Sequence, residues 1–300
     1  MKKKMLLLAV LFISTGLVFA AVDFARIDDL YFHSEIDEVQ RLLETALDSG
    51  ISDEEKVGVL WRLARNCIDL GDRLPDDAKK EKYATFEKGE AFADQSIALK
   101  ETPEGYIWKS SNIGRWGQTK GPLNSLAKAE PMRELLTKVV NDFKYLESSD
   151  VWYVIGCLYD QLPGMPISFG NSNMGLSYMR LAVKTIPSWV WYGGTYQYLA
   201  EALYKRNWSD SKRNSEFPKI EKKYEKTKGS QFKKLGYYEG SLDLNSTPVY
   251  ASRPLGKMSD REEAVAVLRY ALKVYENRDF HTKGDVKNYE EINALLDSWT

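Results

Sequence analysis

Apolar residues recur at helical spacing along most of the chain, and they define the predicted elements. The first such element precedes Trp61 and ends at Gly50, a residue type that commonly stops a helix. Its apolar positions are three or four residues apart and fall on one helical face: Ile36, Val39, Leu43 and Leu47. The pattern therefore predicts a leading amphipathic helix.

Three later segments also carry helix signals. The segment AEPMRELLTKVVNDFKYL has Pro131 where we expect the first turn, a position at which the missing amide costs nothing. In MSDREEAVAVLRYALKVYEN, Ser259 is followed three positions later by Glu262, the spacing of a capping box. Residues 286–299 form the last predicted helix.

A tryptophan near the start of a helical segment recurs at Trp61, Trp108, Trp152 and Trp191. The intervals are 47, 44 and 39 residues, longer than the period of about 34 residues of a tetratricopeptide repeat (TPR). Each predicted repeat therefore carries an extended turn or an extra loop. We assign the first three tryptophans to packing between helices.

Small residues mark the second helix of two predicted repeats. A spacing of seven and then five residues occurs twice, in Ala91, Ala98 and Pro103 and in Gly175, Ala182 and Pro187. Residues seven apart share one stripe of a helix, where small side chains let a neighbouring helix approach closely. The alternative is a chance alignment of helical core positions.

Residues 229–257 have no helical period and are rich in Gly, Ser, Pro and Tyr. A structureless segment of this length is uncommon in a compact protein unless it has a use. We interpret it as an aromatic arm folded over the array, with a flexible surface loop as the alternative. The large apolar residues that favour an arm are Phe232, Tyr237, Tyr238, Leu242, Leu244, Val249 and Tyr250.

Residues 1–20 have the layout of a secretory signal peptide. Three lysines precede an apolar run that is short for a membrane span, and small residues lead to a predicted cleavage after Ala20. An uncleaved N-terminal anchor is the alternative. We therefore expect a periplasmic or secreted chain that begins at Ala21 and has no membrane span.

Charge and reactive side chains exclude several functions. Without the three lysines the formal net charge falls from −1 to about −4, with acids and bases interspersed, so nucleic acid is not an expected partner. Cys67 and Cys157 lie in apolar runs of different repeats, and we expect both to be buried and unpaired. Because His33 and His281 are the only histidines and lie near opposite ends, no metal or cofactor site is expected.

The repeat region has several distinctive motifs. They are the WRLAR opening at Trp61, a tryptophan helix that ends in Gly117 and Gly121, and an LPG turn at residues 162–164. Over roughly residues 55–205 the chain resembles the TPR-type domain of the regulator of microtubule dynamics family and its bacterial relatives. In outline it is also similar to the TPR-like component associated with TRAP transporters. The likeness implies an all-helical interaction protein rather than an enzyme.

Catalytic motifs are absent from the sequence. No metalloprotease, phosphate-binding or dinucleotide-binding motif occurs, and the two histidines lie outside the repeat core. We therefore predict that the protein is not an enzyme. A pair of carboxylates, for which Asp160 and Glu201 are candidates, leaves a helical carbohydrate-active enzyme as an alternative.

The first helix of each TPR pair lines the concave face of the array. With each tryptophan as the packing residue of its repeat, we predict six partner-binding residues: Arg62 and Asn66, Lys109 and Trp116, and Tyr153 and Asp160. Cations, amides and aromatic rings suit a peptide or a carboxylate-bearing ligand. A solvated helix face, with Trp116 covered by the Gly-rich turn, is the alternative.

The sequence thus predicts an all-α protein with a TPR-like right-handed superhelix of about four helix pairs. The signal peptide is followed by the repeat domain (21–228), the arm (229–257) and C-terminal helices that pack on the array (258–300). We expect non-catalytic binding of a protein or peptide partner, for instance as an accessory to solute uptake or envelope assembly. A solute-binding protein with a pocket between array and arm is the other alternative.

Overall fold

The computed structural model describes residues 21–300, except for the side chains of residues 122–125. The predicted signal peptide, residues 1–20, lies outside the described residues. The described part of the chain forms thirteen α-helices, two short 3-10 helices (η1 and η2) and no strand, so the all-α prediction is confirmed. In chain order the elements are α1 (Phe24–Phe32), α2 (Ile36–Asp48), α3 (Asp53–Asp72), α4 (Lys79–Leu99), α5 (Pro103–Lys120), α6 (Pro122–Asn141), α7 (Ser149–Gln161), α8 (Ser172–Lys184), α9 (Gly193–Arg206), α10 (Asp210–Lys226), α11 (Gln231–Leu235), η1 (Tyr238–Ser241), η2 (Leu255–Lys257), α12 (Asp260–Glu276) and α13 (Lys283–Trp299).

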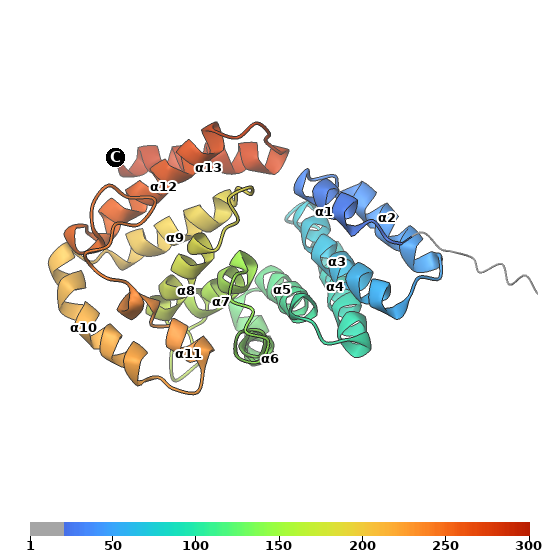
Figure 1. Cartoon of the computed structure of the whole chain (residues 1–300), viewed down its shortest axis with the longest axis horizontal. Helices are drawn as coiled ribbons and strands as arrows, with labels where there is room; N and C mark the ends of the chain where they lie inside the picture. Colours follow the sequence, from blue (N-terminus) through green and yellow to red (C-terminus); the bar gives the residue numbers. More distant parts are fainter. Residues whose placement is uncertain (1–20) are drawn as a thin grey trace, which may run out of the picture.

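Three consecutive helix pairs, α3 with α4, α5 with α6 and α7 with α8, follow one another along an arc (Figure 1). Each second helix also packs on the first helix of the next pair, which is how a TPR-like array propagates. Helices α1 and α2 precede the first pair. They are separated at Ser34, whose φ of 60° interrupts the helix. Residues 30–50, predicted as one leading helix, are therefore divided between α1 and α2, and the predicted apolar face from Ile36 to Leu47 lies in α2.

The fourth pair consists of α9 and α12, which are not consecutive in the chain. Helix α10, α11 and the segment with η1 and η2 form an insertion between them, and Figure 1 shows this insertion along the outer side of the arc. The Tyr178 hydroxyl on α8 donates to the Phe232 carbonyl at 2.9 Å, and Phe232 is 2% exposed. Residues 229–257 therefore form a packed arm on the array.

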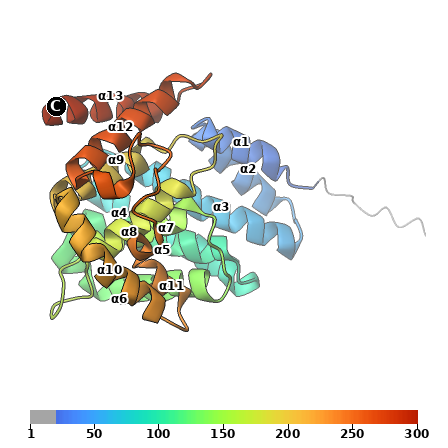
Figure 2. The ribbon, with the colours of Figure 1, turned by 60° about the vertical axis from the view of Figure 1, so that its left-hand side comes forward.

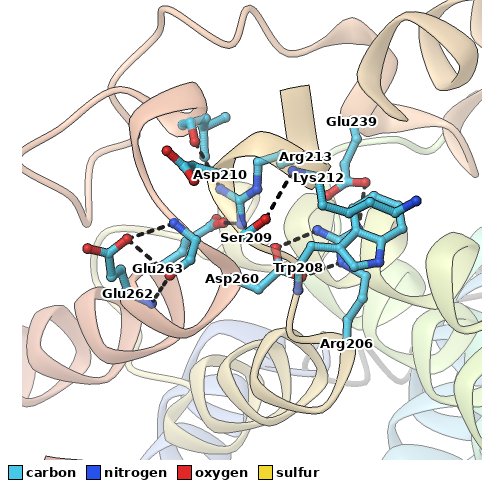
Figure 3. A network of polar contacts seen from close by, with 12 residues as sticks. Arg206, Trp208, Ser209, Asp210, Lys212, Arg213, Glu239, Asp260, Glu262 and Glu263 are labelled. Atoms are coloured by element: carbon cyan, nitrogen blue, oxygen red, sulfur yellow. Dashed lines mark hydrogen bonds and ion pairs between the residues drawn. The ribbon is translucent and has the colours of Figure 1, made fainter. Parts of the chain in front are cut away.

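A buried network of charges fastens the arm and α12 to the array. It contains three arginines and three carboxylates: Arg180, Arg206, Arg213, Glu239, Asp260 and Glu263. Arg206 donates from Nε to Asp260 Oδ2 at 2.7 Å and from Nη1 to Glu239 Oε2 at 2.8 Å (Figure 3). The six groups come from α8, α9, α10, the arm and α12, and their charges balance. Such a set is stable only when it is complete, because each missing partner leaves a buried charge uncompensated.

The two ends of the arc meet. The Phe32 ring at the end of α1 packs edge-on against Trp189, in the loop before α9, with ring centroids 4.7 Å apart. The His33 ring lies 4.5 Å from Phe280, in the loop between α12 and α13. Figure 2 shows the loop before α9 reaching toward α1. The arc is therefore closed into a ring by aromatic contacts between residues far apart in sequence.

The helix start predicted at Pro131 is wrong. Helix α6 begins at Pro122, after Gly121 with a φ of 94°, and Pro131 lies in the helix interior. Pro122 is thus the proline of the first turn, where the missing N–H group would have no partner in the helix anyway. The capping box at Ser259 and Glu262 is confirmed at the start of α12.

The small-residue stripe is confirmed in one repeat and wrong in the other. In α8, Gly175 and Ala182 are buried, and Ala182 has no exposed surface. In α4, by contrast, Ala91 and Ala98 are exposed, and the buried small residues are Gly89, Ala93 and Ser96. A Cβ at Gly89 would lie 2.1 Å from the Asn112 side chain on α5, so the two helices pack closely at this face.

Cys67 and Cys157 are both buried and unpaired, as the sequence predicted. Among residues 21–300, no helix has the length and the apolar character needed to cross a membrane.

Candidate functional site

The concave side of the ring contains a cavity with two adjoining regions. The first, about 280 Å³, is bounded mainly by α3, α5, α6 and α7. The second, about 410 Å³, lies toward the closure of the ring and is bounded by α1, α3, α5, α7, the loop before α9 and the start of α13. Both regions share six lining residues: Tyr31, Asp69, Trp108, Arg115, Asp150 and Tyr153. We call the whole space the central cavity.

The first helix of each of the first three pairs presents one stripe of side chains to this cavity. The stripes are spaced three or four residues apart, as one helical face requires: Arg65, Asp69 and Asp72 on α3; Trp108, Ser111 and Arg115 on α5; Asp150, Tyr153 and Cys157 on α7. The prediction that the first helices line the concave face is therefore confirmed for these pairs.

The region of about 280 Å³ has a mainly apolar wall. Its apolar lining comes from α3, α5, α6 and α7 and includes Ile68, Trp108, Ile113, Met132, Val154 and Leu158. Gly114 on α5 also lines it, and a Cβ there would lie 3.0 Å from the Met132 side chain. The Met132 side chain on α6 thus occupies the space beside Gly114, where α6 packs closely on α5.

An ion-pair cluster holds α1 against α3 at one side of the cavity. Asp28 on α1 accepts from Arg62 Nη2 at 2.6 Å and from Arg65 Nη2 at 2.8 Å. Burial alone would raise the pKa of Asp28, but the hydrogen bonds and charges of the two arginines outweigh it and lower the pKa. The Arg65 guanidinium also lies 3.7 Å from the centre of the Tyr31 ring. Both arginines are therefore committed to positioning α1.

A second polar cluster joins α3, α5 and α7. Arg115 Nη2 lies 2.8 Å from Asp72 Oδ2, and Arg115 Nη1 donates to Gln118 Oε1 at 3.0 Å. The Gln118 side chain in turn donates to Gln161 Oε1 at 3.2 Å. Burial raises the pKa of Asp72, against the opposing effect of Arg115. The Arg115 charge is thus also matched within the protein.

Two aspartates face the cavity without an ion pair. Asp69 Oδ2 accepts from the Tyr31 hydroxyl at 2.8 Å, and burial raises the pKa of Asp69. Asp150 lies in the first turn of α7, and among the described residues it has no side-chain hydrogen-bond or ion-pair partner. Burial raises the pKa of Asp150 to about 6, with the charge of Asp69 adding to the shift and Arg65 opposing it. Asp150 is therefore a carboxylate surrounded by protein but open to the cavity.

Tyrosines around Asp150 are neutral at ordinary pH. Burial raises the pKa of Tyr31, Tyr153 and Tyr192, and the charge of Asp150 adds to the shift for Tyr31 and Tyr192. All three side chains line the region of about 410 Å³. They surround the carboxylate with rings and hydroxyl groups rather than with cations.

A family model matches the first half of the described chain. Residues 23–156 match the family described as regulator of microtubule dynamics protein 1-3. The resemblance predicted over roughly residues 55–205 is thereby confirmed as far as residue 156, and the match also includes α1 and α2. The regulator of microtubule dynamics match therefore includes Tyr31, Asp69, Trp108, Asp150 and Tyr153, whereas Tyr192 and the closing loops lie beyond it. A search of curated proteins found no match.

Among the six predicted binding residues, only Tyr153 lines the central cavity. Arg62 pairs with Asp28, as described above. Asn66 is fully buried and donates to the Ile36 carbonyl at 3.1 Å, so it joins α3 to α2. Arg62 and Asn66 therefore hold helices together and do not face an open groove.

The other three predicted residues lie outside the cavity lining. Lys109 pairs with Asp94 on α4 at 2.5 Å, and Trp116 Nε1 donates to Glu87 at 3.0 Å. Asp160 accepts from the Tyr198 hydroxyl at 3.3 Å. Binding of a partner by these residues stays a prediction, and the structure does not bring them together in one site.

The register of the predicted stripes failed because the tryptophans are not equivalent. Trp152 is 1% exposed and stacks on Tyr178 of α8, which confirms a packing role. Trp108 instead lines the cavity. The binding residues were predicted by counting from the tryptophan of each repeat. Because these tryptophans face different sides, most of the predicted residues fall on a helix face that does not line the cavity. The signal that could have found the site is the set of charged residues Arg65, Asp69 and Asp72, which are three or four positions apart and share one helical face.

No group of three or more metal-ligating side chains occurs among the residues that the structure describes. The cavity lining offers carboxylates, guanidinium groups, the Lys128 ammonium group, the Cys157 thiol, tyrosine hydroxyls and aromatic rings.

Proposed function

We propose that this protein is a non-catalytic binding protein whose ligand is a small molecule held in the central cavity. Ligand sites are typically concave, mostly apolar and supplied with a few polar groups that fix orientation. The apolar wall of α5, α6 and α7 beside Asp69 and Asp150 has this composition. A solute-binding function is therefore favoured over a scaffold for an extended peptide.

The observation that carries the proposal is the closure of the ring. In an open TPR array a peptide can run along the concave groove. Here the contacts of Phe32 with Trp189 and of His33 with Phe280 close that groove. Arg278 Nη1 lies 3.5 Å from the Trp189 carbonyl oxygen and so joins the two loops on one side of this closure to each other. A compact ligand fits such a space better than an extended segment does.

The position of the cavity differs from the pocket expected between array and arm. The arm packs on the outer side of the arc, whereas the cavity is bounded by the first helices of the pairs and by the closing loops. Export to the periplasm or the outside of the cell is part of the proposal and is supported by the signal-like pattern of residues 1–20.

The test is a fluorescence titration of residues 21–300 with N-phenyl-1-naphthylamine, a neutral apolar dye. We expect saturable binding at about one dye per chain. Val154→Trp should fill the apolar region and weaken dye binding at least about 10-fold, a loss of about 1.4 kcal/mol. Val286→Trp makes the same change at an exposed position on α13, where the valine is 42% exposed, and serves as the control.

Dye binding that is absent, or equally strong in Val154→Trp, would refute a ligand site in the cavity. Capture of a protein partner that competes with the dye would instead support the scaffold function. Such a partner would have to open the ring, so its binding should be stronger for Trp189→Ala than for the parent protein.

A second candidate function follows from the two aspartates in one cavity. A carboxylic acid with a raised pKa is a common general acid, and Asp150 and Asp69 both have raised pKa values. A carbohydrate-active enzyme would therefore use this pair rather than Asp160 and Glu201. Hydrolysis of a glycan panel that is lost in both Asp69→Asn and Asp150→Asn would support it over non-catalytic binding.

A further inference from the structure

The central cavity carries a charge pattern that points to one chemical class of ligand. Around it, Arg62 and Arg65 pair with Asp28, and Arg115 pairs with Asp72. Asp69 accepts a hydrogen bond from Tyr31. The charged residues that line the cavity are four aspartates and four cations: Asp69, Asp72, Asp150 and Asp285, with Arg65, Arg115, Lys128 and Arg278. Lys128 pairs with Glu90, and Asp285 accepts from the Thr282 amide. Among these four aspartates, Asp150 is the one without a hydrogen-bond or ion-pair partner in the described part of the chain.

The position of Asp150 makes its unpaired carboxylate usable by a ligand. Asp150 lines both regions of the cavity and has no hydrogen-bond or ion-pair partner within the described residues. A carboxylate that the protein largely surrounds and that has no partner is costly, and such groups cluster at functional sites. A ligand cation beside Asp150 would supply the missing partner.

Aromatic rings around the carboxylate favour the same kind of ligand. The Tyr31, Trp108, Tyr153 and Tyr192 side chains line the region of about 410 Å³ together with Asp150. The faces of aromatic rings attract cations, most strongly when water is excluded. An anion at this position would meet Asp150 and Asp69, while Arg65 and Arg115 are already paired with Asp28 and Asp72.

The apolar region supplies the other half of the recognition. It adjoins Asp150 through Val154 and Leu158 on the same helix, α7, and continues to Met132 on α6. An alkyl or aryl group can therefore lie along this wall while its charged end reaches Asp150.

We infer that the central cavity selects a small ligand that carries a protonated amine on an apolar body, with the amine beside Asp150. This inference rests on the proposed solute-binding function and specifies its ligand class.

The experiment measures displacement of N-phenyl-1-naphthylamine at pH 7.5 by octylamine, octanol and octanoate, which share one chain and differ in their head groups. We expect octylamine to bind at least about 10-fold more tightly than octanol, because its ammonium group would make one charge-assisted hydrogen bond with the Asp150 carboxylate. Octanoate should bind no more tightly than octanol. In Asp150→Asn the advantage of octylamine should fall below about 3-fold, with octanol affinity unchanged.

Asp48→Asn is the matched control, because it removes the same formal charge at an exposed position at the end of α2. It should keep the full preference for octylamine. If Asp150→Asn fails to fold, the pH dependence of the parent protein replaces it. The preference for octylamine should decline between pH 7.5 and pH 5, because the pKa of Asp150 is raised to about 6. The groups that face Asp150 are Tyr31, Arg65, Asp69 and Arg115 from α1, α3 and α5, Tyr145 and Tyr192 from the adjacent loops, and Tyr153 on α7 itself.

Each outcome separates the two proposals. If the dye binds and octanol displaces it as well as octylamine does, the amine class is overturned and the binding function stands. A preference for octylamine that survives in Asp150→Asn, or that is flat across the pH range, also overturns the role of Asp150. If the dye does not bind at all, the failure lies with the proposed function itself.

Discussion

Loss of one carboxylate from the buried charge network should destabilise the fold strongly. Glu263 on α12 has no exposed surface and accepts from Arg180 Nη2 at 2.8 Å and from the Tyr250 hydroxyl at 2.7 Å. Arg213 Nη2 lies 2.7 Å from Glu263 Oε2, the oxygen that also accepts from Arg180 Nη2. Burial would raise the pKa of Glu263, but Arg180 and Arg213 outweigh it and hold the pKa below its usual range, so the side chain is charged.

Glu263→Gln keeps the shape of the side chain and removes only the charge. The network then contains three buried arginines and two carboxylates. Removal of one partner from a buried ion pair typically costs about 3–5 kcal/mol, because the remaining charge is left uncompensated. We expect a loss of that size in the free energy of unfolding.

The assay is urea unfolding followed by circular dichroism, with the midpoint and slope compared between variants. Glu262→Gln is the matched control: its side chain is 49% exposed, it pairs with Arg253, and glutamine can also complete the capping box with Ser259. This control should cost less than about 1 kcal/mol.

A double variant tests the electrostatic origin of the effect. Arg180→Met with Glu263→Gln restores equal numbers of buried charges, so it should be more stable than Glu263→Gln alone. The reasoning is refuted if Glu263→Gln unfolds within about 1 kcal/mol of the parent protein, or if the two substitutions simply add.

Three further predictions follow from the packing and charges. Ala182→Leu should cost about 1–3 kcal/mol by overpacking, whereas Ala98→Leu, at an exposed position, should change stability by less than about 0.5 kcal/mol; equal urea midpoints would contradict the assigned helix faces. Asp150→Asn should increase the free energy of unfolding at pH 7.5 by on the order of 1–3 kcal/mol, because burial raises the pKa of Asp150 from 3.8 to about 6. A higher thermal midpoint measures this gain. Asp150 binds its proton more tightly in the folded state than in the unfolded state, so the gain is fully present above the folded pKa and disappears as the pH falls to about 4. A gain that does not depend on pH would contradict this prediction. Arg62→Glu places a second negative charge against Asp28, so limited proteolysis should cleave α1 faster than in the parent, and unchanged cleavage would rule out the positioning role.

The sequence by itself determined the elements of this protein. The apolar spacing from Ile36 to Leu47, the capping box at Ser259 and Glu262, and the recurring tryptophan helices are local patterns. Local patterns specify a helix because hydrogen bonds and side-chain periodicity both act within a few turns. The all-α class and the likeness to the regulator of microtubule dynamics family could therefore be predicted.

The tertiary structure alone decided which face of each helix meets which neighbour. Gly89 and Ala93 are buried instead of Ala91 and Ala98, because α5 approaches that side of α4. The site depends on the same choice: Asp69 and Asp150 come from repeats 81 positions apart in the chain, and their common cavity exists only because the arc curves.

The closure of the ring could not be predicted for a similar reason. It joins Phe32 to Trp189 and His33 to Phe280, contacts that no local period encodes. Small rotations between successive helix pairs accumulate along a repeat array, so the meeting of its two ends depends on every junction between them.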